Sequence, residues 1–344
     1  MTAMRDELAY RLPKAELHVH AEACLEPELL LQIAERNGHD LPYASIDEVR
    51  RAYEWSDLGA FLDLYYRHIE VLRTETDFRQ LVESYMSHAA EQGVRHVEMF
   101  FDPQAHTRRG VPLATVVDGL AAGLDSGARE HGISGALIAC FIRELGVESA
   151  QETLAELAEL PAFERIVGIG LDSIEEGFPP PLFAPLYAQA RALGLLGVIH
   201  AGEAGPGENV GLALSVLGVE RIDHGVRCGD DAASIAALRE RGTALTVCPL
   251  SNVRIGMYET LADHPVAQLL RDGLEVTINS DGPAYFGGYI ADNWVAVQRQ
   301  FDLDVDDLVT LARRSIAVSF ATAERKAQLL REIDRMLDKA TATN

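Results

Sequence analysis

The sequence predicts an α/β protein built as a (β/α)₈ TIM barrel, and two observations point to this fold class. Eight short apolar runs rich in β-branched residues have the near-continuous apolarity of strands buried on both faces of a parallel sheet. From the second run onward, their spacing leaves room for a strand, a helix and two loops. A doubly wound open sheet is the alternative, but eight alternating units favour the barrel. The runs cover residues 15–20, 96–101, 135–142, 166–172, 196–202, 221–225, 244–250 and 274–281.

Amphipathic stretches with helical spacing lie between these runs. Residues 112–132 form one such stretch, and residues 230–242 form another, with an Asp pair in its first turn and a glycine just past its end. The segment 21–95 is too long for a single connection and has helical spacing at 55–72. We therefore expect a helical insertion over the mouth of the barrel. The chain has no internal repeat and no linker rich in Pro, Gly and Ser, which predicts a single domain over residues 1–344.

Composition excludes several classes of function. Of the 344 residues, 48% are hydrophobic and 24% are charged, as in soluble globular proteins. Asp and Glu outnumber Lys and Arg by 53 to 30, and a net charge of −23 repels polyanions, so neither a nucleic acid nor an anionic membrane is expected as a partner. The first residues lack a signal-peptide core and no membrane span is visible, which favours a cytoplasmic protein. The 4 cysteines form no C-x-x-C pair and are expected in the core.

Metal-binding and proton-transferring side chains recur where the predicted strands end. His18 and His20 end the first run, two residues apart, so both point to the same side of the strand. His200 ends the fifth run, His224 the sixth and Asp281 the eighth. In a barrel all five lie at the carboxyl-terminal mouth, where barrel enzymes build their active sites. Each residue alone is a weak signal, but four strands that present such groups at one end predict a catalytic centre.

The type of side chain predicts the metal and the chemistry. Imidazoles and a carboxylate suit Zn²⁺ best and also accept Fe²⁺, Mn²⁺ or Co²⁺. The fourth run contains neither Lys nor Glu to bridge a second ion, so one metal per chain is expected. Zinc makes water nucleophilic near neutral pH, which predicts hydrolysis. His224 is placed to orient or deprotonate that water, and Glu203, in the turn after the fifth strand, is placed to supply a proton.

At this point the sequence resembles the adenosine and adenine deaminase family of mononuclear zinc hydrolases. The resemblance covers nearly the whole chain and is carried by PKAELHVH (13–20), VIHAGEAG (198–205), RIDHGVR (221–227), CPLSNV (248–253) and NSDGPAYFGGY (279–289). Three further segments are more similar to the adenine branch than to the adenosine branch: ELHVHAEACLEPEL (16–29), FFDPQAHTRRGV (100–111) and LDSIEEGFPPP (171–181).

The resemblance implies roles for individual residues. The metal ligands would be His18, His20, His200 and Asp281. Glu203 would protonate the ring nitrogen N1, and His224 would act on the water bound to zinc. The backbone N–H of Ser173 would meet the purine N3.

The sequence departs from this family next to the expected substrate. Family members usually carry a second Asp that binds the purine N7, at the position where this chain has Gly282. The segment after the first strand also differs, and within it Glu22 is expected either to touch the substrate or to brace the zinc histidines. The residues expected to bind the metal and transfer protons therefore match the family pattern, whereas the residues expected around the substrate differ from it.

These observations lead to one expected function and two alternatives. We expect zinc-dependent deamination of a 6-aminopurine, with adenine giving hypoxanthine and ammonia. The first alternative is the same chemistry on adenosine, an N6-substituted adenine or a modified nucleoside, for which Gly282 would leave room. The second is a zinc-binding protein with little catalysis, although Glu203 and His224 would then have no purpose. The expected partner is a small purine, and a homo-oligomer is compatible with the sequence.

Overall fold

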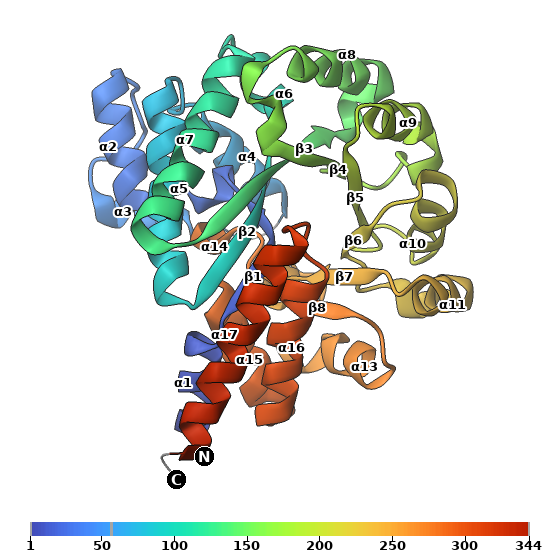
Figure 1. Ribbon diagram of the computed structural model, residues 1–344. Helices are drawn as coiled ribbons and strands as arrows, with labels where there is room; N and C mark the ends of the chain where they lie inside the picture. Colours follow the sequence, from blue (N-terminus) through green and yellow to red (C-terminus); the bar gives the residue numbers. More distant parts are fainter. Residues whose placement is uncertain (1, 56–57, 343–344) are drawn as a thin grey trace.

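The computed structural model describes residues 2–55 and 58–342, and its centre is a ring of eight parallel strands. The strands pair in chain order, with helices outside them (Figure 1), so the predicted TIM-barrel class is confirmed. All eight predicted runs contain a strand. The strands are β1 (Lys14–His20), β2 (Val94–Phe101), β3 (Ser134–Ile142), β4 (Ile166–Asp172), β5 (Leu196–Ala201), β6 (Arg221–His224), β7 (Ala244–Val247) and β8 (Val276–Ile278).

The ring closes between β1 and the segment that follows β8. A parallel bridge joins Val19 to Asp281. The Asp281 N–H donates to the His18 carbonyl at 3.0 Å, and the His20 N–H donates to the Asp281 carbonyl at 2.8 Å. The Asn279 side chain also accepts the Leu17 N–H, at 2.9 Å. Residues from both ends of the chain are thereby held in one register.

Four helices lie between β1 and β2, as the length of this segment predicts. They are α2 (Pro27–Asn37), α3 (Ile46–Ala52), α4 (Leu58–Ile69) and α5 (Glu75–Glu91). Thr74 caps α5 in a capping box with Asp77. Helix α5 packs along α7 (Leu113–His131) and so belongs to the outer layer of the barrel. Helices α2 to α4 are therefore the part that is inserted into the barrel fold. The predicted helical stretch at 55–72 corresponds to α4, although its residues 56 and 57 lie outside the described residues.

The other helices cover the outside of the barrel and one of its ends. Helices α1 and α17, at the two ends of the described chain, lie together at the bottom of the view in Figure 1. None of the helices in the described ranges combines the length and apolar content that crossing a bilayer requires. Besides α2 to α5 and α7, the α-helices are α1 (Thr2–Arg11), α6 (Pro103–Thr107), α8 (Gly146–Ala158), α9 (Ala184–Ala192), α10 (Glu208–Leu212), α11 (Ala232–Arg241), α12 (Pro249–Arg254), α13 (Val266–Arg271), α14 (Pro283–Phe286), α15 (Ile290–Phe301), α16 (Val305–Ala317) and α17 (Ala323–Ala342) in the described residues.

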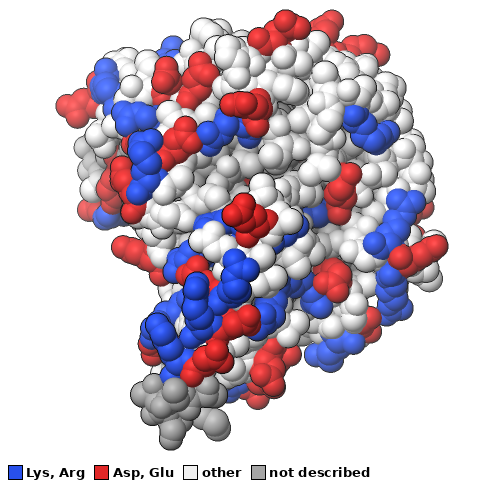
Figure 2. All heavy atoms as spheres, viewed as in Figure 1, with Lys and Arg blue, Asp and Glu red and all other residues white. Residues whose placement is uncertain are grey.

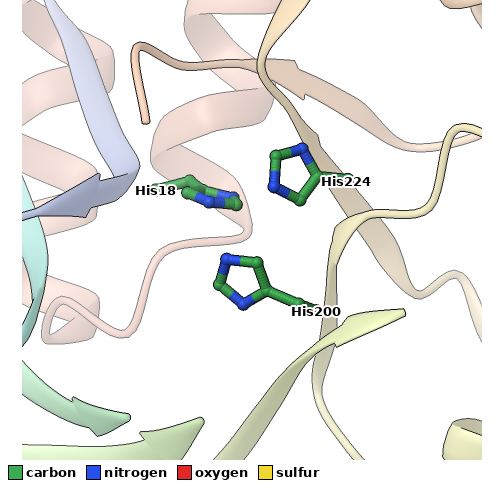
Figure 3. A group of neighbouring side chains, drawn as sticks. All are labelled: His18, His200 and His224. Atoms are coloured by element: carbon green, nitrogen blue, oxygen red, sulfur yellow. The ribbon is translucent and has the colours of Figure 1, made fainter. Parts of the chain in front are cut away.

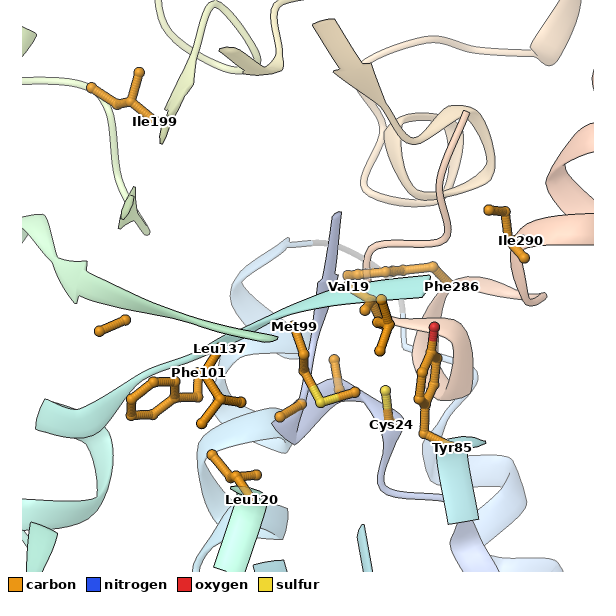
Figure 4. Packing of buried hydrophobic residues seen from close by; sticks show 14 of the residues in the cluster. Val19, Cys24, Tyr85, Met99, Phe101, Leu120, Leu137, Ile199, Phe286 and Ile290 are labelled. Atoms are coloured by element: carbon orange, nitrogen blue, oxygen red, sulfur yellow. The ribbon is translucent and has the colours of Figure 1, made fainter. Parts of the chain in front are cut away.

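The apolar core has two parts. The larger part lies between strands and helices, where Met99 and Leu137 from neighbouring strands pack close to Leu120 of α7 (Figure 4). The smaller part fills the inside of the barrel and consists of Phe100, Ile138, Cys140 and Val198. All four cysteines are free and buried, as predicted.

Charged side chains of both signs are interspersed on the face of the molecule seen in Figure 2. Inside the barrel, a buried ion pair joins Arg221 at the start of β6 to Glu98 in β2, and the guanidinium lies 3.9 Å from the centre of the Phe320 ring. This polar layer and the small apolar cluster fill the interior, so ligands approach from the carboxyl-terminal mouth.

Candidate active site and metal centre

The side chains predicted at the strand ends converge in the structure. The Nε2 atoms of His18 and His20 lie 3.6 and 3.5 Å from Oδ1 of Asp281. The Nε2 atoms of His20 and His200 are 3.2 Å apart. His18, His200 and His224 point toward one another from β1, β5 and β6 (Figure 3), and their ring nitrogens lie within 4.8 Å of one another. The same limit applies to His18, His20 and Asp281, so these five side chains form one cluster.

Backbone conformation aims several of these side chains. His224, Asp281 and Ser173 have φ values of 60°, 65° and 67°, which non-glycine residues rarely adopt. Such conformations cost on the order of 1–3 kcal/mol each and concentrate at functional sites. Among the described residues only Asp302 shares this feature elsewhere, at the end of α15. At these three positions, at or after the ends of β4, β6 and β8, the left-handed conformation turns the chain out of the strand direction at the mouth.

The buried neighbours of His18 fix which of its nitrogens faces the cluster. Its Nδ1–H donates to the Thr246 carbonyl at 3.1 Å, which leaves Nε2 directed at the cluster. Nε2 is buried and has no hydrogen-bond partner within the described chain. Thr246 also donates to Asp223 at 2.8 Å, and the other carboxylate oxygen of Asp223 lies 3.7 Å from Nδ1 of His200. Such outer partners orient metal-binding imidazoles and set their tautomers.

The donor set fits a divalent metal of the zinc type. Burial, followed by the charges of the other histidines, lowers the pKa of His200 well below its usual value, so its imidazole is neutral. Burial would raise the pKa of the Asp281 carboxyl, but the surrounding histidines outweigh it and lower that pKa, so the carboxyl is anionic. Ser251 donates to Asp281 at 2.5 Å. Imidazole nitrogens that face one another beside a carboxylate are suited to a cation.

A second group of side chains holds Glu203 and His224 in place. The Val266 N–H donates to Nδ1 of His264 at 3.1 Å, so the ring proton of His264 lies on Nε2 and is donated to Oδ1 of Asn252 at 3.1 Å. The Asn252 amide nitrogen must then donate, and it reaches Oε1 of Glu203 at 2.9 Å and Nδ1 of His224 at 3.1 Å. The neutral His224 therefore carries its proton on Nε2, which lies 3.4 Å from Glu203.

The turn that carries Glu203 is built around another carboxylate. Glu175 accepts the backbone N–H groups of Gly202, Glu203 and Gly205 at 2.9, 2.9 and 3.0 Å. Burial, and then the charges of Asp281 and Glu175, raise the pKa of Glu203 well above its usual value. Glu203 is thus suited to hold a proton at neutral pH and to donate it.

A cavity of about 370 Å³ opens above the cluster. Its volume falls within the range of pockets that bind small molecules. The helical segment α4 contributes Phe61, Leu62, Tyr65 and Tyr66 to its wall, so the predicted position of the insertion over the mouth agrees with the structure. Other lining residues are His20, Ala23, Asp102, Asp172, Ser173, Ile174, Glu175, Glu176, His200, Glu203, Ala204, His224, Ser251, Ile255, Met257, Asp281 and Phe286.

Two of the predicted substrate contacts are not part of this lining. Glu22 is buried and accepts hydrogen bonds from Nε2 of His106 at 2.8 Å and from the Asp102 N–H at 3.0 Å. Arg109 donates to the other ring nitrogen of His106 at 2.5 Å. A Cβ added at Gly282 would lie 2.7 Å from the Cβ of Ala23 and 2.9 Å from the Phe286 ring. Protein atoms, rather than open space, therefore adjoin Gly282.

Sequence reasoning assigned no role to several residues of the site. Asn252 lies in the CPLSNV segment, which contributed to the family resemblance without indicating a role for this residue. His264 and Glu175 come from loops, and their roles depend on contacts across the fold. Asp172 ends a predicted strand, as the histidines do, and this position was the available signal for it.

Comparison with known proteins agrees with the site. The sequence profile of the Adenosine deaminase family matches residues 13–336. An adenine deaminase of Streptomyces coelicolor is 52% identical over 325 residues, which cover 94% of this chain and 95% of the relative. For an adenine deaminase of Cupriavidus taiwanensis the identity is 50% over 324 residues, with coverages of 94% and 92%.

Solved structures are similar as well. The crystal structure of an adenine deaminase from Arthrobacter aurescens superposes with a TM-score of 0.91 at 48% identity, covering 95% of this chain and 99% of that one. An amidohydrolase from Burkholderia ambifaria with bound Zn superposes with a TM-score of 0.89 at 28% identity, with coverages of 99% and 96%.

The packing around Gly282 predicts that a side chain there destabilises the protein. Gly282→Ala places a methyl group against Ala23 and Phe286 and is expected to lower the free energy of unfolding by about 1–3 kcal/mol. Gly229→Ala is the matched control, because a Cβ at Gly229 meets nothing within 4 Å. Denaturant unfolding of both variants measures the difference, and equal stabilities would contradict the packing argument.

The Asn252 hydrogen bonds predict a catalytic defect without loss of metal. Asn252→Ala removes the donor shared by Glu203 and His224, and kcat should fall by about 10- to 100-fold. Zinc content should stay unchanged, because the Asn252 side chain hydrogen-bonds Glu203, His224 and His264 and none of the four predicted ligands. Wild-type turnover, or a parallel loss of zinc, would show that this amide does not position the pair.

Proposed function

This chain belongs to the adenosine deaminase family, and from that premise we propose that it deaminates adenine to hypoxanthine and ammonia with one zinc ion per chain. The observation that carries the proposal is a cluster of imidazoles and one carboxylate that lies beside the partly buried acid Glu203 at the floor of a small-molecule cavity. Relatives named adenine deaminase share about half of its residues over most of the chain, which supports adenine as the substrate.

In the proposed site, His18, His20, His200 and Asp281 hold the metal, and His224 stays outside the ligand set. His224 is assigned outside because Asn252 and Glu203 already engage its ring. When bound, zinc lowers the pKa of a water so that a nucleophile is available near neutral pH. Fe²⁺, Mn²⁺ and Co²⁺ accept the same donors.

The protein's own residues then move the protons. Glu203 holds a proton at neutral pH and gives it to the ring nitrogen N1, which makes C6 more electrophilic. The Nε2–H of His224 faces Glu203 and Asp281, so it orients the attacking water and stabilises charge that develops on the oxygen. Asp281 accepts a hydrogen bond from the same water. Addition of water and loss of ammonia give hypoxanthine.

The cavity suits a flat heterocycle. Ser173 lies in its wall, and we propose that its backbone N–H meets the purine N3. We keep Glu22 and Gly282 as parts of the wall that supports the substrate. The alternative of a bulkier substrate depended on space beside Gly282, and Ala23 and Phe286 occupy that space. A zinc protein without catalysis would not require the hydrogen bonds that hold Glu203 and His224.

Composition supports the remaining parts of the proposal. A net charge of −23 disfavours nucleic acids and anionic membranes as partners. The free, buried cysteines fit a reducing compartment, and we propose that the enzyme acts in the cytoplasm on a free purine base.

Metal removal tests the first part of this proposal. Purified protein is expected to contain one zinc per chain, and chelation should abolish ammonia release from adenine. One equivalent of zinc should restore the activity. Full activity in metal-free protein would overturn the proposal.

A conservative change at Glu203 tests the proton donor. Glu203→Gln keeps the shape of the side chain but cannot give its proton to N1, so kcat is expected to fall at least about 100-fold. Zinc content should remain at the wild-type value. Glu208→Gln, an exposed change on α10, is the control and should leave kcat unchanged. If the Glu203 variant retains most of its turnover, another group donates the proton.

A further inference from the structure

Two buried carboxyl groups in the cavity wall have no part in the mechanism above. Asp102 directly follows β2, and Asp172 is the last residue of β4. They are only 4% and 6% exposed, and both line the cavity. A carboxylate oxygen of each lies within 4.8 Å of the other and of a ring nitrogen of His20.

The two carboxyl side chains hydrogen-bond to each other, and each keeps one oxygen that lacks a donor. Oδ1 of Asp102 and Oδ1 of Asp172 are buried and have no hydrogen-bond partner among the residues that the structure describes. The nearest ring nitrogen, Nδ1 of His20, lies 3.9 Å from the other oxygen of Asp172. Arg143 is buried nearby, but it donates to the carbonyl groups of Phe178 and His200. Both carboxyls line the cavity, so an N–H donor of a ligand can reach the pair from there.

The positions of the strands show which part of a purine would meet this pair. In a ring of eight strands, β2 and β4 lie across the mouth from β6 and β8, which carry His224 and Asp281. If C6 and N1 of adenine face Glu203 and the metal ligands, the five-membered ring points to the opposite side. That ring carries the N9–H group, the one ring N–H of the common adenine tautomer.

From this juxtaposition we propose that the Asp102–Asp172 pair accepts the N9–H of the substrate and selects free bases over nucleosides. In a nucleoside a sugar carbon replaces that hydrogen, so the hydrogen bond is lost and the substituent meets buried carboxyl oxygens. A site that is built to bind an N–H rejects analogues that lack it far more strongly than an apolar pocket does. This inference rests on the proposed deamination of adenine and adds the determinant of substrate class.

The two carboxyls differ in how clearly a mutation can test them. Asp172 lies close to His20, a proposed metal ligand, so changes at Asp172 would mix substrate recognition with metal binding. The close contact to His20 comes from Asp172 and not from Asp102, whose backbone N–H is held independently by Glu22. Asp102→Ala and Asp102→Asn are therefore the informative variants, and Asp118→Asn, an exposed change on α7, is the matched control.

The experiment compares adenine with 9-methyladenine as substrates of zinc-loaded protein. Wild type and the Asp118 variant should prefer adenine by at least about 100-fold in kcat/KM. Asp102→Ala should lower kcat/KM for adenine by about 10- to 100-fold and change the value for 9-methyladenine by less than about threefold. Calorimetric affinities for hypoxanthine and 9-methylhypoxanthine should show the same collapse of preference, which provides a readout independent of turnover. Asp102→Asn should reproduce the effect with wild-type thermal stability.

Three results would overturn the inference, and they are distinguishable. Equal losses for both substrates would make Asp102 a general structural support. A second zinc equivalent that is present in wild type and lost in the Asp102 variants would identify the pair and His20 as a cation site. Wild-type, zinc-loaded protein that releases no ammonia from adenine would contradict the proposed function itself, and the inference with it.

Discussion

The parallel pairing of Asp281 with β1 is the interaction on which the site depends. It closes the barrel, and it does so at the residues proposed to hold the metal. The Asp281 N–H binds the carbonyl of His18, and the Asp281 carbonyl binds the N–H of His20. A slip of one residue would turn the side chains of one partner to the other face. The backbone hydrogen bonds that complete the fold therefore also bring ligands from opposite ends of the chain together.

Environment gives the two carboxyl groups of the centre opposite properties. Asp281 is surrounded by imidazoles and receives the Ser251 hydroxyl, and its pKa is lowered despite burial. Glu203 is partly buried beside other carboxylates, and desolvation and their charges raise its pKa. Carboxyl groups whose pKa values are driven apart in one site divide the work of ligand and proton donor. Separate buried networks support the two roles: Thr246 and Asp223 behind His18 and His200, and His264 with Asn252 behind Glu203 and His224.

The sequence was most informative where a local pattern and a physical requirement coincide. Strands buried on both faces must be apolar, so all eight were visible, and polar residues at their ends stood out against that background. The hydrogen-bonded part of the last strand, Val276–Ile278, is shorter than the predicted 274–281, because Asn279 and Asp281 turn to pair with β1. Asn252 and His264 could not be assigned roles, since these arise only when loops meet across the mouth. The environment of Gly282 was misjudged for the same reason: Ala23, far away in the chain, and Phe286 fill the space that a missing side chain seemed to leave.

The distribution of polarity around the cavity constrains how a purine can lie in it. On the side of β1, Ala23 and Phe286 form an apolar surface, while helix α4 adds the rings of Phe61 and Tyr65. The polar groups of the wall include the proposed metal and proton-transfer residues, the adjoining Asp102–Asp172 pair and Ser173. A flat base between the apolar surfaces is stabilised when its polar edges face these groups, because an orientation that turns a ring nitrogen to Ala23 or Phe286 buries it against carbon. Orientation is thus set by where the protein lacks hydrogen-bonding groups as much as by where it has them. An enzyme that must deliver one proton to one ring nitrogen benefits from having few alternative binding modes.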